Sequence, residues 1–224
     1  MSIPSPDTPD DIPARIAYRD WAAVYDSNEN RTRDLDATCL IAADLPLAGA
    51  TVVEFGAGTG KNTAHLARRA TRVTAMDLSP DMLARARKRG LGDHVRFIEH
   101  DITGPWPVEP ASADLVVGNL VLEHVRDLAP VLVEAAKALR PGGRLYLSEL
   151  HPFRQLRGSQ ARFDRADGSA ARVEAYYHGV SEYLAAAQAA GLALLSLDEP
   201  IEDGATIGAE TPPRLLVLQF VKTA

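Results

Sequence analysis

The sequence predicts an α/β fold: a doubly wound, Rossmann-like sheet of seven mostly parallel strands, with helices on both faces and an antiparallel last strand. Three observations support this prediction. Short apolar runs alternate with helical patterns from residue 51 onwards, which is typical of repeated βαβ units. The first run, Thr51–Phe55, stops at three glycines spaced two apart. The last two apolar runs are joined by a Gly- and Pro-rich segment without helical periodicity, which favours antiparallel pairing.

The apolar runs and the helical patterns give the order of the elements. Strands are expected at residues 51–55, 72–77, 95–101, 114–119, 144–150, 192–198 and 214–221. Between them, helices are expected at residues 62–70, from Pro80 behind the N-cap Ser79, from Asp127 to Leu139, and at 181–190. Two more helical patterns, at residues 15–27 and 33–43, precede the first strand.

The domain organisation follows from length and local composition. A chain of 224 residues with 46% hydrophobic residues can bury one full core, so we expect a single domain over residues 14–224. Four prolines among acidic residues predict a disordered tail at residues 1–13. Residues 14–45 are expected to form a helical cap. Residues 151–178 exceed the usual connection length, and we expect a lid or hairpin insertion there, with Asp167-Gly168 as its turn.

Charge and cysteine content exclude several classes of function. A formal charge of −6 and a pI near 5.5 disfavour a nucleic-acid surface, and no apolar run is long enough to cross a membrane. Cys39 is the only cysteine, which excludes an intrachain disulfide or an iron–sulfur cluster and fits a reducing cytoplasm. We therefore expect a cytoplasmic protein without a metal site, and we leave a homodimer open.

The glycine loop at residues 56–60 indicates a nucleotide-like ligand, because glycines let the backbone come close to it. A dinucleotide fingerprint requires glycine where this chain has Lys61, and a P-loop requires Ser or Thr where it has Asn62. Glu54 beside the loop would repel a pyrophosphate but tolerate an ammonium or a sulfonium. Asp77 ends the second strand, where doubly wound folds place the carboxylate that binds a ribose diol.

Five segments together resemble a class I S-adenosylmethionine-dependent methyltransferase of the small-molecule, methyltransferase-11-like group. Their order and spacing match that family from about residue 18 to the C-terminus, although each segment alone is a weak signal. The segments are Glu54-Phe55-Gly56-Ala57-Gly58-Thr59-Gly60, the strand-ending Asp77, His100-Asp101-Ile102, Asp114-Leu115-Val116-Val117 and Leu139-Arg140-Pro141-Gly142-Gly143.

The resemblance implies S-adenosylmethionine as the cofactor and assigns its contacts. The loop of Gly56, Ala57, Gly58 and Gly60 would hold the methionine part, with Glu54 near its ammonium. The other contacts would surround the ribose, the adenine and the transferable methyl: Asp77 for the ribose, Leu78, Met82, Asp101 and Ile102 for the adenine, Asn119 and Leu120 near the methyl, and Tyr25 in a lid over the cofactor.

The acceptor side of the site is less determined. His124 and His151 are the candidate bases, His151 because it directly follows strand five. The candidates for binding the acceptor are Tyr18, Trp21, Arg154, Phe163, Tyr176, Tyr177 and His178. The implied activity is methyl transfer to a small, largely apolar organic acceptor at O, N or C, in specialised metabolism. A non-methylating S-adenosylmethionine protein and, less favoured, a nicotinamide-dependent oxidoreductase remain alternatives.

Overall fold

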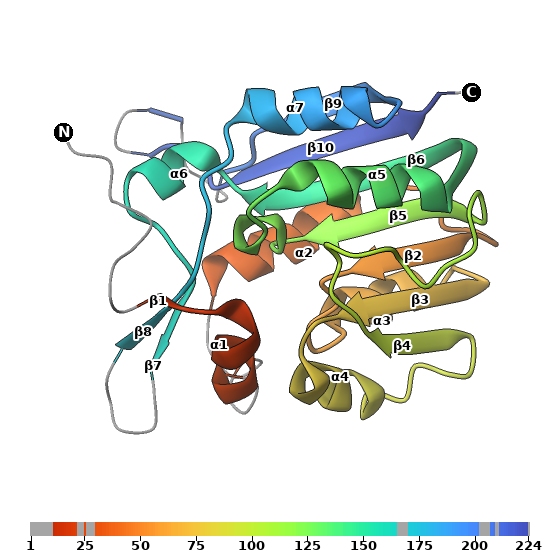
Figure 1. Cartoon of the computed structure of the whole chain (residues 1–224), viewed down its shortest axis with the longest axis horizontal. Coiled ribbons are helices and arrows are strands. Elements are labelled where there is room, and N and C mark those ends of the chain that lie inside the picture. The colour runs from red at the N-terminus through yellow and green to blue at the C-terminus, as the bar shows by residue number, and fades with distance from the viewer. Residues whose placement is uncertain are drawn as a thin grey trace.

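The computed structural model describes residues 11–21, 25, 30–164, 170–201, 207–208 and 211–223, with the side chains of Asp20, Phe163, Asp164 and Ala170 outside this description. A seven-stranded sheet runs through its centre in the order β4-β3-β2-β5-β6-β10-β9 (Figure 1). Its strands are β2 (Thr51–Phe55), β3 (Arg72–Asp77), β4 (Val95–Glu99), β5 (Ala113–Asn119), β6 (Leu139–Leu150), β9 (Leu192–Asp198) and β10 (Leu215–Lys222).

The pairing of these strands confirms the predicted doubly wound topology. β2 pairs in parallel with β3 on one side and with β5 on the other, and β3 pairs in parallel with β4. β10 runs antiparallel to both β6 and β9, so the last strand has the expected reversed direction. The chain builds the sheet outward from β2 in one direction and then from β5 in the other. Ligands of such sheets bind at this reversal, beyond the carboxyl ends of the strands.

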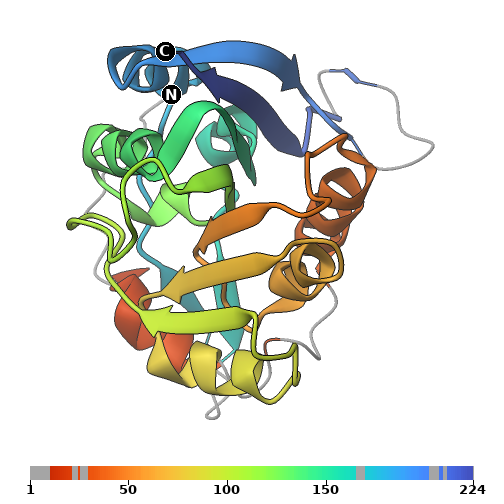
Figure 2. The ribbon, with the colours of Figure 1, turned by 90° about the vertical axis from the view of Figure 1, so that its right-hand side faces the viewer.

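Helices cover both faces of the large sheet (Figure 2). Successive side chains of a strand point to opposite faces, so Val53 and Phe55 enter one core while Val52 enters the other. The first core packs against α5 and α7, and the second packs against α2 and α3. The helices are α1 (Ala14–Trp21), α2 (Arg31–Ala42), α3 (Lys61–Ala67), α4 (Pro80–Arg87), α5 (Leu128–Ala138), α6 (Pro152–Leu156) and α7 (Val180–Ala189), with a 3-10 turn, η1, at Leu122–His124.

Several predicted boundaries shift by a few residues. The helix expected to end at Leu139 ends at Ala138, because Leu139 pairs with Ala113 and opens β6. The strand expected to reach residue 101 ends at Glu99. Ser79 caps α4 as predicted, since its Oγ accepts a hydrogen bond from the Met82 N–H at 3.3 Å.

A second, three-stranded sheet lies beside the first and has the order β1-β8-β7. β7 (Arg162–Asp164) and β8 (Ala170–Val173) pair antiparallel within the segment expected to form a hairpin, while the Asp167-Gly168 turn lies outside the described residues. β1 (Asp11–Ile12) pairs in parallel with β8. The prediction of a tail through residue 13 was therefore wrong at its end, because short-range composition does not report pairing with a strand 160 residues away.

The helix α6 was not predicted. His151 is its N-cap and Pro152 its first residue, and it lies between β6 and the small sheet. In the described part of the chain, no helix is both long and apolar enough to cross a membrane.

Candidate active site

The glycine loop follows β2 at the point where the strand order reverses. Gly56, Gly58 and Gly60 have φ of 69°, 54° and 78°, the left-handed region that favours glycine. A Cβ on Gly56 would lie 2.7 Å from the Val121 side chain, and one on Gly60 would lie 3.0 Å from Ala86 Cβ. A Cβ on Gly58 would meet no atom within 4 Å. Gly56 and Gly60 therefore serve close packing, whereas Gly58 faces open space.

Asp77 joins this loop to the end of β3. Its Oδ2 accepts a hydrogen bond from the Gly58 N–H at 2.7 Å, and its Oδ1 accepts one from the Ser79 N–H at 2.8 Å. Burial raises the pKa of the Asp77 carboxyl, and the two backbone donors oppose that shift. These two bonds use one lone pair of each carboxylate oxygen and fix the carboxylate in place, so that the second lone pair of each oxygen has a defined direction.

Glu54 lies beneath the loop, at the end of β2. Its Oε2 accepts a hydrogen bond from Thr63 Oγ1 at 2.5 Å, and the side chain is buried. Burial raises the pKa of Glu54 to about 8, although the Thr63 hydroxyl favours the ionised form. A cation bound next to Glu54 would favour the ionised form of its carboxyl group.

Two cavities lie next to the loop and have Gly56 as a common lining residue. The loop cavity has a volume of about 370 Å³, and the smaller β3 cavity has a volume of about 190 Å³. The loop cavity is lined by Tyr25, Arg33, Asp34, Asp36, Glu54, Gly56, Ala57, Gly58, Thr59, Lys61, Asn62, Arg89, Asn119 and Leu120. The β3 cavity is lined by Ala14, Arg15, Tyr18, Gly56, Asp77, Leu78, Ser79, His100, Asp101, Ile102, Thr103, Val121, His124 and Val125.

Asp36 is a member of this site that the sequence did not reveal. It is buried on α2, and its two carboxylate oxygens accept hydrogen bonds from Asn119 Nδ2 at 2.6 Å and Asn62 Nδ2 at 3.0 Å. Burial raises the pKa of Asp36, and these amide donors oppose the shift. The sequence gives no local signal for this role, because Asn62 and Asn119 lie on other elements. Asp36 thereby holds Asn119 beside the glycine loop.

Most residues expected around the cofactor do line the two cavities. Leu78, Asp101 and Ile102 line the β3 cavity, where Asp101 Oδ1 also accepts hydrogen bonds from the backbone and hydroxyl of Thr103. Met82 and Gly60 are exceptions, because neither lines a cavity, and Met82 is completely buried. Leu120 has φ of 51°, an uncommon conformation for a leucine. Such backbone strain concentrates at functional sites.

A third cavity, of about 640 Å³, adjoins both of the others; we call it the arginine cavity. It shares Tyr25, Arg33 and Leu120 with the loop cavity and Tyr18 with the β3 cavity. Its wall is mostly charged and polar, whereas the acceptor predicted from the sequence was largely apolar. The described lining residues are Tyr18, Trp21, Tyr25, Asn30, Arg31, Thr32, Arg33, Leu120, Glu123, Leu150, Arg154, Arg157, Gly158, Ser159, Gln160, Ala161, Arg162, Arg172 and Arg214.

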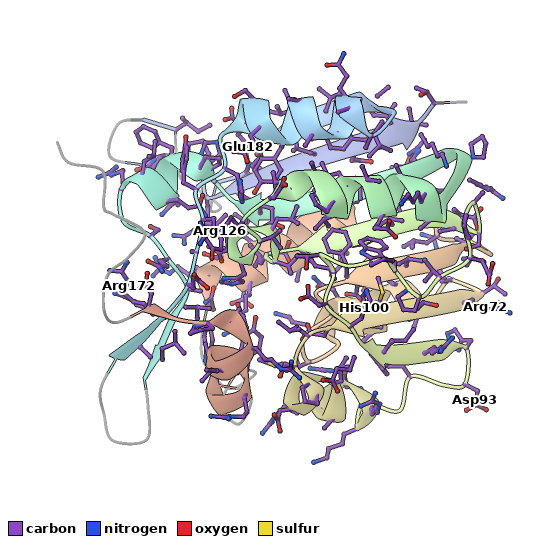
Figure 3. The ribbon with its side chains drawn as sticks, viewed as in Figure 1. Arg72, Asp93, His100, Arg126, Arg172 and Glu182 are labelled. Atoms are coloured by element: carbon purple, nitrogen blue, oxygen red, sulfur yellow. The ribbon has the colours of Figure 1, made fainter. Side chains whose placement is uncertain are left out.

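The helix α1 separates the arginine cavity from the β3 cavity. Figure 3 shows Arg172, of the arginine cavity, and His100, of the β3 cavity, on opposite sides of α1. Tyr18 stacks on Trp21 with ring centroids 5.8 Å apart, and Tyr25 meets Trp21 edge-on at 4.9 Å. The Arg33 guanidinium lies 4.1 Å from the centre of the Tyr25 ring. These aromatic residues form a wall between the cavities.

Tyr18 and His124 form a directed hydrogen-bonded pair. His124 Nδ1 lies 2.7 Å from the Glu174 carbonyl oxygen, which can only accept, so Nδ1 carries the proton. In the neutral ring Nε2 is then the acceptor, and the Tyr18 hydroxyl, at 2.8 Å, donates to it. Burial raises the pKa of Tyr18 well above its ordinary value, so the phenol stays neutral until a base takes its proton.

Several predicted acceptor-side residues do not reach any of these cavities. His151 is buried, with Nδ1 accepting from the Phe153 N–H at 3.2 Å and Nε2 lying 2.8 Å from Glu199 Oε1. Both ring nitrogens of His151 therefore already have partners within the protein, and the residue lies outside the three cavity walls, so the structure does not place it as a base.

Other predicted acceptor-side residues also lie outside the three cavity walls: Tyr176, exposed Tyr177 and buried His178. The Phe163 side chain is outside the described residues.

Comparison with known proteins gives the family. Residues 53–147 match the family model described as a methyltransferase domain. A ubiquinone biosynthesis O-methyltransferase of Xylella fastidiosa is 37% identical over 113 residues, which are 50% of this chain and 46% of that protein. The chain thus spans about half the length of this relative.

Solved structures match most of the fold. The structure titled as the DhpI–SAH complex has a TM-score of 0.68 at 25% identity, covering 92% of this chain and 93% of that one. An S-adenosylmethionine-dependent methyltransferase from Mesorhizobium loti has a TM-score of 0.69 at 24% identity, covering 82% and 96%. Residues 53–147, which match the family model, include the glycine loop, Asp77 and Asn119. These similarities together support a class I S-adenosylmethionine-dependent methyltransferase with S-adenosylmethionine as its cofactor.

Proposed function

We propose that this chain transfers a methyl group from S-adenosylmethionine to a small-molecule acceptor. The observation that carries the proposal is the way the cavities meet. The loop and β3 cavities have the lining residue Gly56 in common, and one elongated ligand would extend across it from one cavity into the other. The arginine cavity meets that space at Tyr25, Arg33 and Leu120 and offers a place for a second ligand beside it.

The residues of the joined cavities fit the cofactor. Gly58 leaves open space where any side chain would project, which is the cradle that a closely bound ligand needs. Asp77 would hold the ribose hydroxyls with its remaining lone pairs, and Glu54 would face the methionine ammonium. Leu78, Asp101 and Ile102 would surround the adenine, since they line the β3 cavity beyond Asp77.

The bound cofactor would supply an electrophilic methyl group on a sulfonium. The chain's own contribution is first to orient the two ligands and to keep water out, which accounts for much of the rate of such a displacement. Tyr18 lines both the β3 and the arginine cavities. Its hydroxyl would take a proton from the acceptor while passing its own proton to His124 Nε2, so His124 would be the final base.

The small sheet would act as the acceptor lid. Ala161, Arg162 and Arg172 from this region line the arginine cavity, and the Gln160 side chain ties the region together by donating to the Val173 carbonyl at 2.6 Å. A lid of this kind would set the acceptor range without contacting the cofactor site.

The test is a labelled-methyl assay with the whole chain, S-adenosylmethionine carrying a deuterated methyl group, and a panel of small hydroxyl, amine and acid acceptors. Mass spectrometry should find the label in one class of acceptor. If S-adenosylhomocysteine binds but no member of a broad panel gains the label, the non-methylating alternative is favoured instead. Binding of NAD in place of S-adenosylhomocysteine would favour an oxidoreductase.

A further inference from the structure

The arginine cavity concentrates positive charge in an otherwise acidic protein. Seven of the chain's twenty arginines line it, whereas the whole chain has a formal charge of −6. Among the described lining residues Glu123 is the only acid. Charge of one sign gathered in a concave wall raises the local concentration of a ligand of the opposite sign.

These arginines come from four separate parts of the chain. They lie at the start of α2, on and after α6, on the small sheet, and just before β10: Arg31 and Arg33, Arg154 and Arg157, Arg162 and Arg172, and Arg214. Side chains this distant in sequence meet only because the fold brings these four segments around one space. Such convergence differs from a run of arginines on a single exposed helix, which is usually a solvated face.

Hydrogen bonds to neutral oxygens orient part of this set. Arg154 donates from Nε to the Pro213 carbonyl at 3.0 Å and from Nη2 to the Pro212 carbonyl at 3.1 Å. Arg214 donates from Nη1 to Thr32 Oγ1 at 3.0 Å. These bonds help to fix the guanidinium groups of Arg154 and Arg214 on the cavity wall, and Arg172 is held there by an ion pair between its Nε and Asp11 Oδ1 at 3.2 Å. Guanidinium groups fixed in this way present their remaining N–H donors to an anion at little entropic cost.

We propose that the acceptor carries an oxyanion, a carboxylate or a phosphate-type group, and that the arginine cavity holds it. The inference rests on the proposed function, because it identifies this cavity as the acceptor site. Guanidinium groups bind both kinds of oxyanion in a bidentate manner. The volume of about 640 Å³ is that of a small-molecule site. Arg33 lines the loop cavity as well, so the anion would lie close to the end of the cofactor site.

The experiment titrates inorganic phosphate, and separately succinate, into the full chain saturated with S-adenosylhomocysteine, at constant ionic strength set with chloride. At least one of the two oxyanions should bind, and the Arg157→Gln/Arg162→Gln double variant should bind it at least tenfold more weakly. Preference for phosphate or for succinate identifies which oxyanion the acceptor carries. Both replaced residues are exposed and lie on the cavity wall, so the fold should tolerate their loss.

The matched control is Arg69→Gln/Arg96→Gln, which removes two charges from exposed positions outside the three cavity walls. It should bind the oxyanion like the wild type. All three proteins should bind S-adenosylhomocysteine equally, which also shows that the variants are folded. If the double variant does not bind S-adenosylhomocysteine, the two single variants are tested in its place. Their separate losses of oxyanion affinity should then multiply to about tenfold.

Two results overturn the inference. One is that neither oxyanion binds beyond the chloride control although S-adenosylhomocysteine binds. The other is that the cavity and control variants weaken oxyanion binding equally. Failure of S-adenosylhomocysteine to bind the wild type would instead contradict the proposed function itself.

Discussion

The carboxylate of Asp77 accepts a hydrogen bond from the backbone N–H of Gly58 at 2.7 Å, so the acid at the end of β3 is tied to the glycine loop that follows β2. The two elements expected to bind opposite parts of one cofactor are thus a single unit. A change at Asp77 should alter the ribose contact and the shape of the loop together.

Replacing Asp77 with Ala should weaken S-adenosylhomocysteine binding strongly. Each charge-assisted hydrogen bond lost contributes about 1.5–3 kcal/mol, so the affinity should fall by roughly 10- to 100-fold or more. Calorimetric titration measures this directly. Asp93→Ala is the control, because Asp93 is exposed and lies away from the cavities, near the amino end of β4 (Figure 3). Unchanged affinity in Asp77→Ala would remove Asp77 from the cofactor site.

Gly58→Val should abolish cofactor binding, because its side chain would enter the open space of the loop cavity. The substitution also strains the backbone, since φ at Gly58 is 54°. Gly90→Val is a matched control for that strain: Gly90 has φ of 64°, its Cβ would also meet nothing within 4 Å, and it lines none of the three cavities. Both variants should lose similar thermal stability, and only Gly58→Val should lose S-adenosylhomocysteine binding. Equal binding by the two would place the ligand elsewhere.

The buried Glu54 predicts a pH-dependent affinity. Its pKa is raised to about 8 by burial, so the free protein holds this proton over most of the neutral range. An ammonium bound beside Glu54 favours the ionised carboxylate. At a pH below this pKa, binding of the ligand must therefore be accompanied by release of the Glu54 proton. The affinity for S-adenosylhomocysteine should therefore rise as the pH increases towards about 8 and then level off. Glu54→Gln should lose this rise. A variant that keeps the same pH profile as the wild type would exclude Glu54 as its source.

The same pKa predicts how the stability of the ligand-free protein changes with pH. The folded state keeps the Glu54 proton to about pH 8, whereas the unfolded chain releases it near pH 4.5. The folded state thus binds more protons between these values, and the contribution of Glu54 to the free energy of unfolding declines as pH rises through that window. Denaturant titrations of wild type and Glu54→Gln should differ in this slope. Parallel slopes would contradict the assignment.

Tyr18→Phe should lower kcat while leaving S-adenosylhomocysteine affinity unchanged. The variant keeps the stacking on Trp21 but removes the hydroxyl that donates to His124. General acid–base catalysis contributes roughly 10²- to 10⁴-fold, so kcat for an acceptor that must lose a proton should fall by about that factor. Tyr177→Phe removes a hydroxyl from an exposed tyrosine outside the cavity walls and should have no effect. Equal kcat in wild type and Tyr18→Phe would exclude the Tyr18–His124 pair as the proton path.

The sequence predicted the sheet and the cofactor side better than the acceptor side, for a physical reason. Strand periodicity and the spacing of Gly56, Gly58 and Asp77 are local signals, and the parallel topology brings strand ends together. The arginine cavity has no local signal, because Arg33, Arg162 and Arg214 meet only through long-range packing. The same applies to Asp36, whose partners Asn62 and Asn119 lie on other elements. His151 seemed a candidate base from its position after a strand, yet capping α6 already uses its Nδ1.

The central claim is that the cavities joined at Gly56 form one S-adenosyl cofactor site. The most direct test is isothermal titration of the wild-type chain with S-adenosylhomocysteine and, separately, with NAD. The structure predicts one-to-one binding of S-adenosylhomocysteine that is lost in Gly58→Val and kept in Gly90→Val, with no saturable binding of NAD. Saturable binding of NAD without binding of S-adenosylhomocysteine, or binding of S-adenosylhomocysteine that Gly58→Val leaves intact, would contradict the claim.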